Sequence, residues 1–116
     1  MKILIVDDDQ NILRLYKEEL EEEGYAVVTA SNGQEAMEQF DKEAPDLVTL
    51  DILLPDIDGI KLLRQMKEKR PRLPVIMSTA YDYRDDFAVW ASEAYIVKSA
   101  DLTELKSTIK KLSEKE

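Results

Sequence analysis

The chain of 116 residues contains no cysteine and no histidine. Without cysteine it forms no disulfide and offers no thiolate nucleophile, and without histidine it lacks the base of serine–histidine triads. Zinc sites built on these two residue types are excluded as well. Any chemistry must therefore come from carboxylates, hydroxyls, lysines and the backbone.

Glycine and long apolar runs are also scarce. None of the three glycines stands in a phosphate-binding loop, which disfavours a flavin- or nucleotide-binding module. The apolar run at the N-terminus stops at Asp7 and does not resemble a signal peptide, and no segment approaches the length of a transmembrane helix. We therefore expect a cytoplasmic protein that has no contact with a membrane.

Positive charge is in the minority, with 16 basic against 25 acidic residues and a formal net charge of −9. Binding to DNA or RNA depends on clusters of lysine and arginine, so we expect no direct nucleic-acid binding. A net charge of this size also serves simply to keep a small domain soluble. The length and the hydrophobic fraction of 44% predict a single domain over residues 1–116 with one core.

Short apolar runs alternate with amphipathic stretches along the whole chain. Unbroken β-branched runs are typical of strands that are buried on both faces, and alternation with helices predicts a parallel sheet. We expect the α/β flavodoxin-like fold, a doubly wound five-stranded sheet of order 2-1-3-4-5 with five helices. The strands are predicted at 3–6, 25–30, 47–50, 75–77 and 95–97, and the helices at 11–23, after 32, after 59, at 82–92 and after 101.

Acidic residues follow two strands that this topology makes neighbours. Asp7, Asp8 and Asp9 follow the first strand, and Asp51 follows the third. Because like charges in one crevice raise a pKa or attract a cation, and because all ligands are oxygens, the pattern indicates Mg²⁺. Alone, an acidic triplet is more often a turn with helix-capping residues. The matching position of Asp51 favours the metal site.

Two further residues end strands on the same edge. Thr79 follows the fourth strand and Lys98 the fifth. Singly they are ordinary turn and surface residues. Together with Asp51 as a nucleophile and a metal site they form a set suited to phosphoryl transfer, which depends on positioning and on neutralising the charge of the phosphoryl oxygens.

In this combination the chain resembles the receiver domain of two-component response regulators over essentially all of its 116 residues. The matching segments are Ile3–Asp9, Pro45–Asp51, Leu54–Gly59, Thr79-Ala80 and Lys98. The resemblance implies that Asp51 accepts a phosphoryl group from a phosphohistidine of a sensor histidine kinase or a histidine phosphotransferase. It also implies that Mg²⁺ is bound by Asp8, Asp51 and the carbonyl of Leu53, with Asp7 acting through water.

The resemblance further implies a switch. Lys98 would pair with the phosphoryl group, Thr79 would move to hydrogen-bond it, and Tyr95 would rotate inward. Such a domain catalyses only its own phosphorylation and dephosphorylation and is not an enzyme in the usual sense. An unnamed downstream protein would read the face made by the fourth helix, fifth strand and fifth helix, through which the monomer could also dimerise weakly.

Some positions depart from the family pattern. Ser99 stands where a proline usually follows the lysine, and the stretch from Thr79 to Lys98 is a few residues short, so we expect a short fourth helix. Leu53 and Tyr81 would flank the path of attacking water and offer neither an amide nor a carboxylate to orient it, which predicts slow self-dephosphorylation. At the start of the first helix, Ile12 and Leu15 fit kinase docking and core packing equally well.

Two other functions are alternatives to a phosphorylated switch. A phosphatase of the haloacid dehalogenase type needs a second acid two residues after the nucleophile, but Leu53 stands there. Such an enzyme also needs a substrate cap, for which 116 residues leave no room, so this function is disfavoured. A degenerate receiver that acts as a non-phosphorylated interaction module is the stronger alternative. The serine at position 99 in place of proline and the short fourth helix support this alternative. The presence of the acids, Thr79 and Lys98 argues against it.

Overall fold

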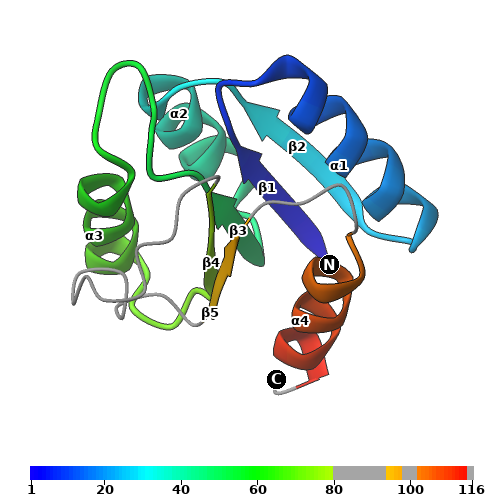
Figure 1. Ribbon diagram of the computed structural model, residues 1–116. Coiled ribbons are helices and arrows are strands. Elements are labelled where there is room, and N and C mark those ends of the chain that lie inside the picture. Colours follow the sequence, from blue (N-terminus) through cyan, green and yellow to red (C-terminus); the bar gives the residue numbers. More distant parts are fainter. Residues whose placement is uncertain (80–93, 98–101, 115–116) are drawn as a thin grey trace.

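The computed structural model describes residues 1–79, 94–97 and 102–114, and residues 79, 94, 95 and 97 are described by their backbone alone. The strands β1, β2, β3, β4 and β5 form one parallel sheet in the order β2-β1-β3-β4-β5. Figure 1 shows the helices that connect and follow them. The elements are β1 (Lys2–Val6), α1 (Gln10–Glu22), β2 (Ala26–Ala30), α2 (Gly33–Glu43), β3 (Leu47–Leu50), α3 (Gly59–Lys69), β4 (Val75–Thr79), β5 (Ala94–Val97) and α4 (Thr103–Glu114).

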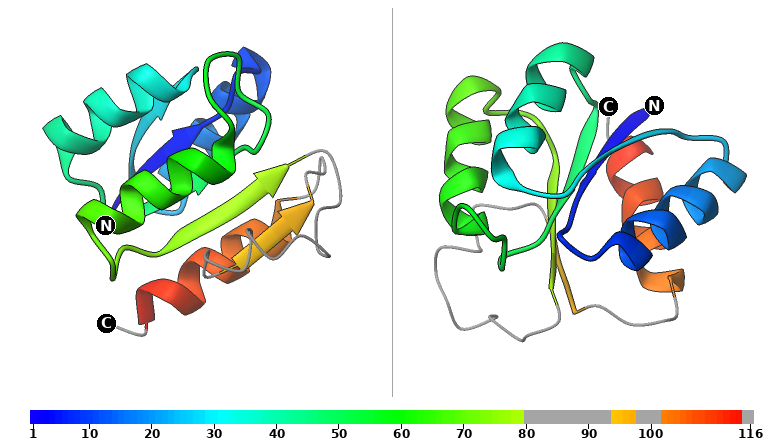
Figure 2. Two further views of the ribbon diagram at one scale, coloured as in Figure 1. Left: turned by 90° about the vertical axis from the view of Figure 1, so that its left-hand side faces the viewer. Right: turned by 90° about the horizontal axis from the view of Figure 1, so that it is seen from above.

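Both faces of the sheet are covered by helices. The helices α2 and α3 pack on one face and α1 and α4 on the other (Figure 2). Because side chains alternate along a strand, Leu4 and Val6 of β1 join the core under α2 and α3, whereas Ile3 and Ile5 join the core under α1 and α4. The central strands are thus buried on both sides, which explains why their sequences are mostly apolar.

The predicted parallel α/β architecture is confirmed, and the predicted strands agree with the observed ones to within one or two residues. The helix that was expected as the fifth is α4. The helix predicted over residues 82–92 lies outside the described residues, so the described part of the chain has four helices rather than the expected five. In the same described part, no helix is long and apolar enough to cross a membrane.

Polar and left-handed residues set the helix ends. Asp9 caps α1 by accepting the N–H of Asn11 at 2.9 Å, and Gly24 leaves that helix with φ of 95°. Asn32 caps α2, and Ala44 ends it in a left-handed conformation with φ of 45°. These turns aim each helix back across the sheet and bring the next strand in parallel to the last.

Candidate functional site at the carboxyl edge of the sheet

The backbone hydrogen bonds of the sheet continue past the ends of β1 and β3. Val6 lies opposite Leu50 in the register of these strands, and the N–H of Asp51 donates to the carbonyl of Val6 at 3.0 Å. The N–H of Asp7 donates to the carbonyl of Ala30, at the end of β2, at 3.1 Å. The backbones of both aspartates are therefore fixed by the sheet itself.

Three carboxylates meet at this edge. Oxygen atoms of Asp7, Asp8 and Asp51 all lie within 4.8 Å of one another. The residues Asp7 and Asp51 are only 2% and 4% exposed, whereas Asp8 is exposed. Burying like charges so close together is unfavourable unless a cation balances them. An all-oxygen donor set with this charge fits Mg²⁺.

Local hydrogen bonds orient the two buried carboxylates. Asp7 accepts the N–H of Asp9 through Oδ1 at 2.9 Å, and Asp51 accepts the N–H of Leu53 through Oδ1 at 3.2 Å. The capping role considered for the whole acidic triplet falls to Asp9 alone, which caps α1. Asp7 and Asp8 are thereby placed in the acidic cluster rather than at the helix cap.

The loop between β3 and α3 packs tightly against Asp51. The N–H of Gly59 donates to the carbonyl of Ile52 at 2.8 Å, and Leu53 forms an antiparallel bridge with Asp58. A Cβ atom on residue 59 would overlap the carbonyl oxygen of Asp51, so only glycine fits there. The side chain of Leu53 is 47% exposed beside the acidic cluster.

Sequence reasoning missed one residue of this loop. The carboxylate of Asp56 accepts the N–H groups of Gly33 and Gln34, at the start of α2, at 2.7 and 3.0 Å. The bond from Gly33, followed by that from Gln34, lowers the pKa of Asp56 below its usual value. The sequence shows two acids between Pro55 and Gly59, Asp56 and Asp58, and neither reveals a partner more than twenty residues away.

Of the other predicted site residues, the structure describes the backbones of Thr79 and Tyr95. Thr79 ends β4 opposite Val97, so its backbone lies at the same edge as Asp51. Tyr95 belongs to β5 opposite Met77, and the side chains of Thr79 and Tyr95 are not described. Tyr81, Lys98 and Ser99 lie outside the described residues, so their roles stay predictions.

The apolar residues at the start of α1 take part in packing. Ile12 and Leu15 are half-buried and pack against the core under α1 and α4. This contact supports the core-packing interpretation of both residues. Their exposed remainder leaves kinase docking as a prediction.

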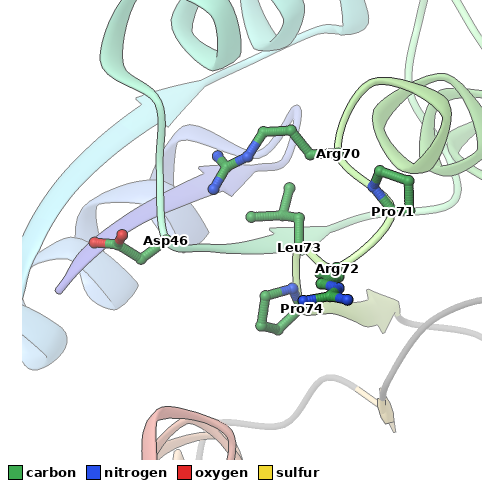
Figure 3. A pocket seen from close by; sticks show the side chains of 6 residues that line it. All are labelled: Asp46, Arg70, Pro71, Arg72, Leu73 and Pro74. Atoms are coloured by element: carbon green, nitrogen blue, oxygen red, sulfur yellow. The ribbon is translucent and has the colours of Figure 1, made fainter. Parts of the chain in front are cut away.

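A cavity of about 400 Å³ lies at the opposite edge of the sheet (Figure 3). Asp46, which lines it, precedes β3, whereas Asp51 follows that strand, a separation of about 16 Å along an extended chain. Arg70, also in its wall, donates to the carbonyl of Pro45 at 2.5 Å and lies 5.9 Å from the ring centroid of Phe40. The cavity is therefore separate from the acidic cluster.

One known protein family matches almost the whole chain. The family model of the response regulator receiver domain matches residues 3–110. The chain therefore belongs to the response regulator receiver domain family.

Two proteins of Bacillus subtilis are similar to this chain in sequence. The chain is 38% identical to sporulation initiation phosphotransferase F of Bacillus subtilis over 113 residues, which is 95% of this chain and 91% of that protein. It is 44% identical to the alkaline phosphatase synthesis transcriptional regulatory protein PhoP of the same species, over 73% of this chain but 35% of the relative. The chain thus spans only about a third of that regulator's length.

Solved structures agree closely in fold. The response regulator TrrA of Thermotoga maritima, solved in complex with Mg²⁺-BeF, superposes with a TM-score of 0.92 at 46% identity, over 96% of this chain and 97% of that one. A second structure holds TrrA in complex with the histidine kinase ThkA, with a TM-score of 0.90, the same identity and the same two coverages.

Proposed function

We propose that this chain is a phosphorylation-activated signalling switch in which Asp51 accepts a phosphoryl group in a Mg²⁺-dependent reaction. The observation that carries the proposal is the buried carboxylate of Asp51 within 4.8 Å of those of Asp7 and Asp8. Family membership supports it, and so does the structure of the relative TrrA with Mg²⁺-BeF.

The residues of the cluster have different roles in binding the metal. Asp8, Asp51 and the carbonyl of Leu53 would hold the metal directly, and Asp7 would hold it through water. When bound, Mg²⁺ supplies positive charge that offsets the carboxylates and the phosphoryl oxygens. The N–H of Leu53 at one oxygen of Asp51 fixes the orientation of the acceptor carboxylate.

The chemical step is a transfer of one phosphoryl group. An oxygen of Asp51 forms a bond to phosphorus while the bond from phosphorus to the donor nitrogen breaks, which returns a neutral histidine to the donor after proton uptake. We assign the hydroxyl of Thr79 and the ammonium of Lys98 to the phosphoryl oxygens, and Tyr95 to the accompanying rotamer change. The new charge of about −1.5 to −2 then biases the surface that a partner reads.

The donor is a histidine kinase or a histidine phosphotransferase, as the structure of TrrA with ThkA suggests by similarity. Ile12 and Leu15 at the start of α1 form part of the docking surface in this proposal. The chain acts on no separate substrate, and residues 1–116 work as one receiver domain. The aspartyl phosphate decays slowly, because Leu53 and Tyr81 offer neither an amide nor a carboxylate to orient the attacking water.

The test is incubation of the chain with Mg²⁺ and a small acyl phosphate, followed by intact mass measurement. The wild type should gain the mass of one phosphoryl group, and Asp51→Asn should gain none. A gain that persists in Asp51→Asn would place the acceptor elsewhere. No gain in either protein would instead favour the degenerate, non-phosphorylated interaction module.

A further inference from the structure

The carboxylate of Asp56 joins the loop between β3 and α3 to the first turn of α2. Its Oδ1 accepts the N–H of Gly33 at 2.7 Å, and its Oδ2 accepts the N–H of Gln34 at 3.0 Å. The next N–H, that of Glu35, donates to Oδ1 of Asn32 at 2.8 Å. The first three amides of α2 thus all have acceptors, and two of these bonds come from a separate loop.

The same loop is held at a second place. The bond from the N–H of Gly59 to the carbonyl of Ile52 and the bridge between Leu53 and Asp58 close its base. At its tip, a Cβ on residue 33 would overlap the side chain of Ile57, so the loop lies directly against the start of α2. The loop is therefore fixed to β3 at one end and to α2 at the other.

We propose that Asp56 is a positioning residue which holds the loop tip on α2 and thereby fixes the backbone of Leu53 beside Asp51, so that it sets the affinity of the acidic cluster for Mg²⁺. The inference rests on the proposed function, because the carbonyl of Leu53 is one of the metal ligands proposed there. Asp56 itself does not touch the reacting atoms.

The N-terminus of α2 stabilises the contact with the charged carboxylate of Asp56. Two N–H groups and the positive end of the helix dipole both favour a negative charge at this place. The same bonds lower the pKa of Asp56, so its carboxylate stays charged at neutral pH. The link is therefore in place under the conditions in which the cluster would bind its metal.

A purely structural role for Asp56 makes a different prediction. If the residue only capped α2, its loss would lower the stability of the protein and leave the affinity for Mg²⁺ unchanged. If it positions Leu53, the affinity must fall. Titration calorimetry with MgCl₂ alone separates the two, because it measures the affinity of the folded protein.

The experiment compares Asp56→Asn with Asp46→Asn. The control removes the same charge and also disturbs a hydrogen bond to a backbone N–H, that of Lys2 at 2.7 Å, but at the opposite edge of the sheet. We expect Asp56→Asn to bind Mg²⁺ about tenfold more weakly than the wild type, the low end for residues that support a metal ligand. Asp46→Asn should stay within about twofold of the wild type, because changes at distant sites without shared partners are nearly independent.

Titration in low and high salt separates positioning from simple attraction between charges. Because the Debye length falls from about 8 Å at 0.15 M to about 3 Å at 1 M salt, a long-range charge effect of Asp56 would largely vanish in 1 M NaCl. The loss caused by a displaced loop should persist. An affinity for Mg²⁺ that is unchanged in Asp56→Asn would overturn this inference, and so would a loss that disappears at high salt. Neither result would affect the proposed function.

A measurement on the wild type covers the case in which Asp56→Asn does not fold. Coupling is reciprocal, so saturating Mg²⁺ must strengthen the link and slow hydrogen exchange at the amides of Gly33 and Gln34. Exchange that Mg²⁺ leaves unchanged would contradict the inference. A wild type that binds no Mg²⁺ at all would instead overturn the proposed function, together with the inference that depends on it.

Discussion

The two edges of the sheet treat charge in opposite ways. At the amino edge opposite charges are paired, as in the ion pairs of Lys2 with Glu43 and of Lys69 with Asp41, both at 3.1 Å. At the carboxyl edge three charges of one sign lie within 4.8 Å of one another, and two of the three residues are buried. Within the described residues, attraction between opposite charges therefore favours folding at the amino edge, whereas the carboxyl edge carries a repulsion that a bound cation would offset.

The largest expected effect concerns packing at the two edges. Gly59→Ala should lower the free energy of unfolding by about 3 kcal/mol, because the new Cβ overlaps the backbone of Asp51 at the carboxyl edge. Gly24→Ala, at the amino edge, meets no atom within 4 Å and should lower it by only about 1–2 kcal/mol through its positive φ.

Urea unfolding followed by circular dichroism measures both variants. Equal losses in the two proteins would show that the contact between residue 59 and Asp51 adds nothing beyond the usual preference for glycine.

The next effect tests the like charges directly. Asp8→Asn should raise the free energy of unfolding by about 1 kcal/mol without metal, because it removes repulsion at a distance below 5 Å. Glu43→Gln, at the amino edge, should lower it by up to about 1 kcal/mol, because it breaks an ion pair. The opposite signs would confirm the contrast between the edges.

Adding Mg²⁺ should make the wild type more stable than Asp8→Asn, which reverses the order of stability expected without metal. At a concentration of 100 times the dissociation constant the wild type gains about 2.7 kcal/mol, and Asp8→Asn gains much less. Thermal unfolding with and without MgCl₂ provides the measurement. Stabilisation of equal size in both proteins would mean that Asp8 does not take part in binding the metal.

The smallest effect concerns an ion pair that joins α1 to α4. Lys106 lies 2.9 Å from Glu19 and 3.5 Å from Glu23, and the hydrogen bond to Glu19 raises the pKa of Lys106 above 10.5. A raised lysine pKa stabilises the fold below pH 10.5, and this contribution is lost as the pH rises through the folded value.

Lys106→Met should therefore be slightly less stable at neutral pH and should lose less stability than the wild type in alkali. Urea unfolding at pH 7 and above pH 10.5 compares the two proteins. Parallel alkaline losses would show that the pair contributes nothing.

The fold was predictable because its signals are local. The runs around Ile5, Val48 and Ile76 are almost entirely apolar, and a parallel sheet follows once amphipathic stretches separate them. The cluster of Asp7, Asp8 and Asp51 was predictable for the same reason, since parallel strands end at one edge.

The remaining features depend on how loops run through space. The hydrogen bond from the N–H of Gly33 to Asp56 joins residues 23 positions apart, and no local pattern encodes it. The capping role of Asp9 was one of several roles open to the triplet, and only the backbone geometry selects among them. The side-chain roles of Thr79 and Lys98 stay predictions.

The pairing of β1 with β3 has an evolutionary consequence. All three acids of the cluster come from the first 51 residues, at the ends of two strands that are hydrogen-bonded to each other. The chain after β4 can therefore change in length and composition without moving these acids, provided that a lysine still reaches the phosphoryl group of the proposed mechanism. Duplicated genes could diversify the rest of the domain in this way without having to rebuild the acidic cluster.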